Sequence, residues 1–165
     1  MANLSEAAVQ AVLDSKLAVV TSPQWREHGT SFKADLPVEN PHRLPLRLSV
    51  TVSARLPGHY SFALLHGNQR IRALDVRGSH KNRCRGSYEA WTRRTHKHAW
   101  TDACAEAWAF TPADIPPTPG TAEAVIPGEY RQSYEAFLAE CHIDQEAPWV
   151  DPEQPRRAQE LGEVG

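Results

Sequence analysis

The sequence is poor in cysteine and has no long apolar run. Its 165 residues include three cysteines, Cys84, Cys104 and Cys141, an odd number without the short paired spacing of a disulfide framework, so we expect reduced thiols. The N-terminus lacks the basic start and apolar run of a signal peptide, and Leu17 to Val20 is far too short to cross a bilayer. These absences predict a soluble cytoplasmic protein that has no membrane partner.

Several catalytic motifs are also missing. The chain has neither the Gly-x4-Gly-Lys-Ser/Thr loop that cradles phosphates nor the glycine fingerprint of dinucleotide-binding domains. It has no Gly-x-Ser-x-Gly elbow and no His-Glu-x-x-His pair. These absences argue against nucleotide-driven enzymes and the common hydrolases, and we expect no cofactor.

The alternation of apolar and polar residues predicts an α+β fold. In residues 44–56, Leu46, Leu48, Val50 and Val52 alternate with polar residues, as in an antiparallel strand with one buried face. Tight turns at 57–58 and 67–68 connect this strand to two more, and further strands are expected at 17–21, 30–36 and 87–100. Helices are expected at 5–13 and 129–141, a short helix at 103–110, and loops at 37–45 and 77–86.

We expect a single domain over residues 1–144. Its mostly antiparallel sheet of five or six strands is packed on one face by the N-terminal and C-terminal helices. Residues 145–165 are acidic and contain prolines, so they are expected to form a loosely held tail.

Half of the basic residues lie between Arg70 and Lys97. This stretch holds nine Lys and Arg residues against Asp75 and Glu89, although the whole chain has a net charge of −2. A cationic surface of this kind can bind nucleic-acid phosphates. The residues expected to do so, with two aromatic rings for base stacking, are Arg83, Arg85, Tyr88, Trp91, Arg93, Arg94 and Lys97.

Three histidines lie in or beside the same stretch. On a strand, His96 and His98 share one face with their Cα atoms roughly 7 Å apart. His80 belongs to a loop that can fold back toward them. A neutral imidazole can take a 2′-hydroxyl proton while a protonated one gives a proton to the leaving oxygen, so His80, His96 and His98 are candidate catalytic residues for metal-independent RNA cleavage.

Simpler interpretations remain open. A solvated polar face of a sheet shows the same His-x-His pattern, and the acidic C-terminal third can pair with the basic stretch. His96, His98, Cys84 and Cys104 are suitable zinc ligands, although their order in the chain matches no structural zinc pattern. Alternatively, His80, His96 and His98 can form a three-histidine zinc site with an open position. Because the surrounding positive charge opposes a dication, no metal is predicted.

The runs from Ile71 to Asn82 and from Thr95 to His98 resemble a pattern in uncharacterised small prokaryotic proteins, which occur in phage genomes and beside toxin–antitoxin loci. In that pattern a strand containing an aspartate leads into a Gly-x-His-x-Asn-like loop and then a His-x-His strand. The resemblance covers about thirty residues and implies a bacterial or phage origin and a nuclease-like toxin role. The basic insert 83–94 and the acidic tail depart from the pattern.

Two functions follow from these observations. The first is binding of RNA or DNA phosphates through residues 70–100, with ribonuclease-like cleavage as an extension. The alternative is a non-catalytic protein–protein interaction module, such as an antitoxin, an inhibitor of a host system or a phage accessory protein, whose basic stretch docks an acidic protein partner.

Overall fold

The structure is a computed structural model that describes residues 2–56, 58–82, 90–110 and 129–150. Two helices and nine strands form within these residues. In chain order they are α1 (Glu6–Leu13), β1 (Leu17–Val19), β2 (Arg26–His28), β3 (Ser31–Glu39), β4 (Leu46–Ser53), β5 (Tyr60–His66), β6 (Gln69–Lys81), β7 (Ala90–Thr101), β8 (Glu106–Phe110), α2 (Glu129–Glu140) and β9 (Ile143–Gln145).

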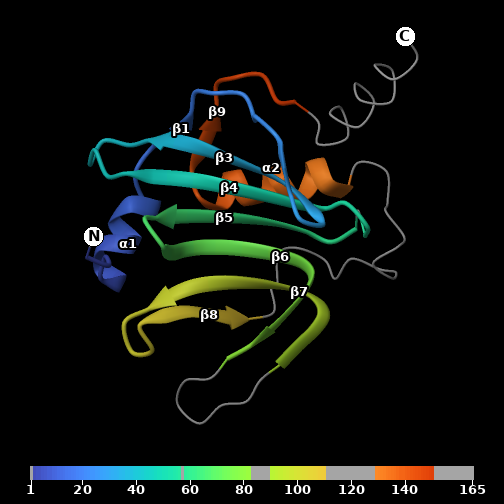
Figure 1. Ribbon diagram of the computed structural model, residues 1–165. Helices are drawn as coiled ribbons and strands as arrows, with labels where there is room; N and C mark the ends of the chain where they lie inside the picture. The colour runs from blue at the N-terminus through green and yellow to red at the C-terminus, as the bar shows by residue number, and fades with distance from the viewer. Residues whose placement is uncertain (1, 57, 83–89, 111–128, 151–165) are drawn as a thin grey trace.

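The strands form one sheet in the order β8-β7-β6-β5-β4-β3-β1-β9, and β2 pairs with β3 (Figure 1). All pairs are antiparallel except β1 with β9. The predicted α+β class and the mostly antiparallel sheet are therefore confirmed. The expected count of five or six strands is wrong, because short strands add to one edge and β8 adds to the other.

Three predicted segments differ from the structure. Residues 106–110 form a strand and not a short helix, because pairing with β7 outweighs the helix propensity of their alanines. The expected loop at 77–86 is wrong as far as Lys81, where β6 ends. The expected loop at 37–45 begins too early, because β3 continues through Pro37 to Glu39. Pro37 pairs with Arg47 of β4 on one side. On its other side no described strand pairs with it, since β2 pairs with β3 before Pro37 and β1 pairs with β3 after it.

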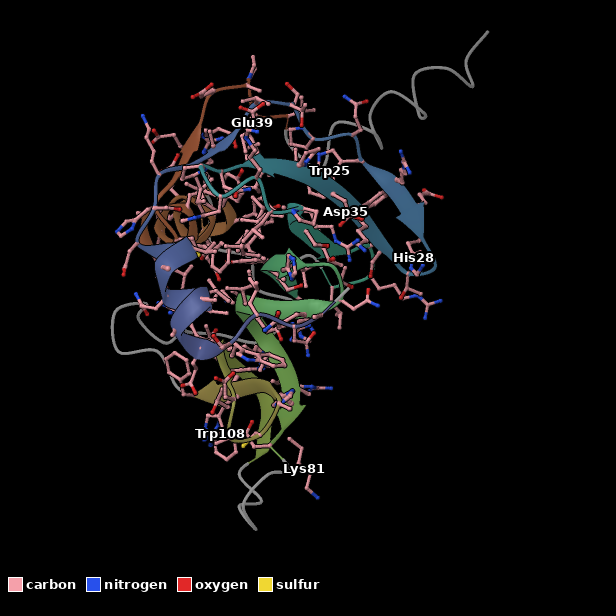
Figure 2. All side chains as sticks on the ribbon, turned by 90° about the vertical axis from the view of Figure 1, so that its left-hand side faces the viewer. Trp25, His28, Asp35, Glu39, Lys81 and Trp108 are labelled. Atoms are coloured by element: carbon pink, nitrogen blue, oxygen red, sulfur yellow. The ribbon has the colours of Figure 1, made fainter. Side chains whose placement is uncertain are left out.

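Both helices lie on the same side of the sheet (Figure 2). Ser5 caps α1, as predicted, by accepting a hydrogen bond from the Ala8 amide at 3.3 Å. The core lies between the helices and the sheet, where Phe62 contacts Tyr134 and Phe137 of α2. We call this side of the sheet the covered face.

The opposite side, which we call the open face, carries mostly small and polar residues. Register fixes this division: Leu48, Val50 and Val52 point to the core, so Ser49 and Thr51 point away from it. On β5 the same alternation places Ser61 and Ala63 on the open face. The expected division into a buried and a polar face is therefore correct for the central strands.

The cysteines depart from expectation. Cys104 is disulfide-bonded, so the prediction of reduced thiols is wrong for this residue. Cys141 is a buried free thiol, and Cys84 lies outside the described residues. Neither helix in the described part of the chain is long and apolar enough to span a bilayer. Most of the predicted tail, residues 151–165, also lies outside the described residues.

Candidate functional site

The three predicted histidines meet on the open face. Pairing of β6 with β7 sets Asp75 opposite His96 and Ala73 opposite His98, so all these residues point to one side of the sheet. The ring centroids of His96 and His98 are 4.9 Å apart, and that of His80 lies 4.6 Å from His98 and 5.9 Å from His96. We call Asp75, His80, His96 and His98 the His–Asp centre.

One carboxylate oxygen joins two of the rings. Asp75 Oδ2 lies 2.9 Å from His98 Nε2 and 3.5 Å from His96 Nε2. The other ring nitrogens face backbone carbonyls: His96 Nδ1 is 2.9 Å from the Arg94 oxygen, and His98 Nδ1 is 3.3 Å from the Ala107 oxygen. Because a carbonyl only accepts hydrogen bonds, these contacts assign the Nδ1 protons and direct both Nε2 atoms at Asp75.

Burial differs within the His–Asp centre. His96 and His98 have no exposed surface, whereas the Asp75 side chain is 21% exposed and His80 is partly exposed. Solvent therefore reaches the centre through Asp75 and His80. His96 and His98 are placed to hold other groups and have no surface with which to contact a substrate.

Charge and burial act in opposite directions on Asp75. Burial opposes its ionisation, but hydrogen bonds from His96 and His98 favour it, and the balance holds the pKa of the carboxyl below its usual range. The pKa of His80 is lowered, first by burial and then by the charges of His98 and His96, and a hydrogen bond with Asn82 opposes this shift.

A bend in β6 builds the site. The pairing of β6 with β7 shifts register twice between Asp75 and His80, and Arg77 has a left-handed φ of 52°. Gly78 lies inside this irregular stretch: a Cβ added there would be 3.0 Å from Asp75 Cβ and 3.2 Å from His96 Cε1. Glycine thus permits the close approach of strand, carboxylate and ring.

The residue that follows β6 is fastened to β8, the strand beyond β7 in the sheet order. The buried side chain of Asn82 donates a hydrogen bond to the Ala109 carbonyl at 2.8 Å and accepts one from the Ala109 amide at 2.9 Å. This pair of bonds joins the end of β6 to a strand with which β6 has no backbone pairing. It fixes the segment that carries His80 beside His98.

The basic residues divide between the two faces. Arg77 forms a buried ion pair with Glu129 of α2, while Arg72 and Lys97 pair with Glu140 on the same helix. These three cations therefore lie on the covered face, including Lys97, which the sequence had indicated as a phosphate contact.

The open face keeps a smaller set of cations. Arg70 lies there, 39% exposed, with Nη1 at 3.7 Å from Asp75 Oδ2. Arg93 and Arg94 are exposed near the start of β7, and their faces are not assigned. Arg83, Arg85 and Tyr88 lie outside the described residues, and the side chain of Trp91 in β7 is likewise not described.

A shallow hollow of about 310 Å³ extends across the open face from Arg70. Two cations border it, Lys33 of β3 and Arg70 of β6, and hydroxyl groups form much of its floor. Its lining residues are His28, Ser31, Lys33, Ser49, Thr51, Ser61, Ala63, Leu65 and Arg70. His28 is labelled in Figure 2, on the side of the sheet away from the helices. Because Arg70 touches both the hollow and Asp75, the hollow and the His–Asp centre are adjacent.

Sequence reasoning missed several members of the site. Asp75 entered only as an acid within the basic stretch and within the resemblance, although its even spacing from Ala73 places it on the same strand face. Gly78 and Asn82 were noticed only as parts of a loop. Arg70 was counted as a basic residue, but nothing in the sequence separated it from Arg72, which points to the other face.

No family model, curated protein or solved structure matches the chain. The resemblance drawn from residues 71–98 thus stays a prediction.

Proposed function

We propose that the open face binds the sugar–phosphate backbone of a nucleic-acid strand and that the His–Asp centre cleaves a phosphodiester held there. The observation that carries this proposal is the convergence of His80, His96 and His98 around Asp75, next to Arg70. An imidazole beside a guanidinium on an accessible surface is suited to proton transfer at a phosphate.

The hollow supports a phosphate-bearing ligand. Lys33 and Arg70 offer charged donors on opposite sides of it, and Ser49, Thr51 and Ser61 offer hydroxyl donors between them. Guanidinium, ammonium and hydroxyl groups make most protein contacts with nucleic-acid phosphates and sugars. A strand lying in the hollow would bring a phosphate to Arg70 and so to the edge of the His–Asp centre.

Within the His–Asp centre the roles divide by exposure. His80 is the partly exposed ring of the three, so it is the group that would take the proton of an RNA 2′-hydroxyl as that oxygen attacks phosphorus. The proton then passes to the 5′-oxygen, whose bond to phosphorus breaks. His96 and His98 have no exposed surface and act through Asp75, which they hold in place. Their role is positioning, and not direct contact with the strand.

Fluorescence anisotropy with labelled single-stranded RNA and DNA tests binding. We expect affinity to fall steeply as salt rises, and Arg70→Ala to weaken binding and reduce the logarithmic salt slope by about one. Arg131→Ala is the matched control because Arg131 is exposed on α2, on the covered side of the sheet. Its binding curve should match that of the unaltered protein.

Cleavage is followed on the same oligonucleotides by gel electrophoresis. His80→Ala should lose cleavage but retain binding, whereas His42→Ala, a change at an exposed histidine outside the site, should retain both. If neither RNA nor DNA binds even at low salt, the proposal is overturned. The protein–protein module with an acidic partner would then be the function to examine.

A further inference from the structure

We propose that Asp75, His96 and His98 form a binding site for one divalent transition-metal ion of the zinc type. Each residue offers one ligand atom, and these atoms all lie within 4.8 Å of one another. We assign them as Asp75 Oδ2 and the Nε2 atoms of both histidines, because both Nε2 atoms face that oxygen. The site itself stands on this geometry. What the ion acts on rests on the proposed function, in which it would neutralise charge on a phosphate bound beside Arg70.

The orientation of the rings is the first argument. Metal-binding histidines usually donate the proton of one ring nitrogen to a carbonyl or carboxylate, which fixes the ring and turns the other nitrogen to the ion. Both rings here show that arrangement, with Nδ1 held by the carbonyls of Arg94 and Ala107. Two independent backbone contacts thus turn both Nε2 atoms toward the same carboxylate oxygen.

The separations are the second argument. Ligand atoms that lie about 2.1 Å from a tetrahedral ion are about 3.4 Å from one another. The distances from Asp75 Oδ2 to the two Nε2 atoms are 2.9 Å and 3.5 Å, close to that value. Three protein ligands leave a fourth position, as in catalytic zinc sites, and the exposed side of Asp75 gives it access to solvent.

The local charge is the third argument. Positive charge in the basic stretch appeared, from the sequence, to oppose a dication. The structure turns Arg72, Arg77 and Lys97 to the covered face, where carboxylates of α2 pair with them. Arg70 remains near the centre, with its Nη1 at 3.7 Å from Asp75 Oδ2, but 39% of its side chain is exposed to solvent, which screens its charge.

A proton is the competing occupant of the site. It would join His98 Nε2 to Asp75 as an ordinary hydrogen bond at 2.9 Å. A single proton joins only one pair of these atoms, whereas an ion between the three atoms engages both rings and the carboxylate. Imidazole and carboxylate together are typical ligands of zinc and of other first-row metals.

Calorimetric titration of tag-free, chelator-treated protein with ZnCl₂ tests the proposal directly. We expect one equivalent to bind, and Asp75→Asn and His98→Gln each to weaken binding by at least about tenfold. The exposed His42→Ala variant should bind as the unaltered protein does. Circular dichroism of each variant checks that the fold is retained.

Cobalt provides a second readout that reports the ligands themselves. Co²⁺ in this site should give the visible absorption of a four-coordinate ion without sulfur charge-transfer bands, because its protein ligands are one oxygen and two nitrogens. The proposal is overturned if neither ion binds, or if Asp75→Asn and His98→Gln bind both ions as tightly as the unaltered protein.

The two proposals fail separately. Metal titration is performed without nucleic acid, and nucleic-acid binding and cleavage are measured with and without chelator. An ion that binds to a protein with no affinity for nucleic acid supports the metal site and refutes the proposed function. Cleavage that persists in chelator, by a protein that binds neither ion, supports the proposed function and refutes the metal site.

Discussion

The ion pair between β6 and α2 allows a quantitative test of how the site is held. Arg77 is 2% exposed, and its two terminal nitrogens lie 2.8 Å and 3.1 Å from the two carboxylate oxygens of Glu129. The same guanidinium donates to the Gly58 carbonyl at 3.0 Å, and the Tyr60 hydroxyl donates to Glu129 at 3.1 Å. Glu129→Gln keeps the shape of the side chain and removes its charge.

Removing one partner of a buried ion pair costs about 3–5 kcal/mol, because it leaves a buried charge without its counter-charge. We expect the lower end, about 3 kcal/mol, since glutamine retains one acceptor oxygen. With a slope of about 2 kcal/mol per molar urea, the unfolding midpoint should fall by about 1.5 M. The double variant Arg77→Met/Glu129→Gln should recover at least about 1.5 kcal/mol of that loss, because no buried charge remains.

Urea denaturation followed by circular dichroism measures each variant. Glu135→Gln is the control: its exposed pair with Arg131 is worth about 0.3–0.5 kcal/mol. A loss below about 1 kcal/mol in Glu129→Gln, or a double variant no more stable than the single one, would refute the reasoning. Because Arg77 lies at the bend of β6, Glu129→Gln should also disturb the His–Asp centre.

Three further changes test the surroundings of the site. Gly78→Ala places a methyl 3.0 Å from Asp75 Cβ, so it should weaken zinc binding in calorimetry, and unchanged affinity would contradict the close-approach argument. Asn82→Ala removes two buried hydrogen bonds to Ala109 of β8 and should lower the free energy of unfolding, measured by urea denaturation, by about 2–4 kcal/mol. A loss under about 1 kcal/mol would show that these two hydrogen bonds are not needed to hold the end of β6. Burial raises the pKa of the Cys141 thiol to about 12, so a thiol reagent at pH 8 should label Cys141 only after unfolding, and rapid labelling of the native protein would contradict its burial.

The spacing of apolar residues predicted those helices and strands that pack one face against the core. The strand at 44–56 and the helix at 129–141 carry apolar stripes that fit a single covered face, and both are confirmed. Residues 106–110 have no apolar stripe of this kind. Their alanines favour a helix, and the pairing that makes them a strand comes from β7, which no local pattern reports.

The His–Asp centre was only partly predictable for a related reason. The shared face of His96 and His98 follows from strand alternation, and it is confirmed. The approach of His80 depends on two register shifts in β6, and the sequence signals of a bulge and of a loop are the same: glycine, serine and asparagine. The face to which each arginine points depends on its position in the alternation of the strand, and the bulges in β6 interrupt that alternation.

The two faces of the sheet place different demands on the residues between Asp75 and His98. The core lies on the covered face, so the fold requires no buried polar group on the open one. Burying a carboxylate and two imidazoles there costs free energy that an apolar cluster of similar size would not. Gly78 and Asn82 add two further specific requirements to keep these groups together. An arrangement that lowers stability and that solvent reaches through Asp75 and His80 is explained by function and not by folding. The His–Asp centre, rather than the larger basic stretch, is therefore the feature to test first.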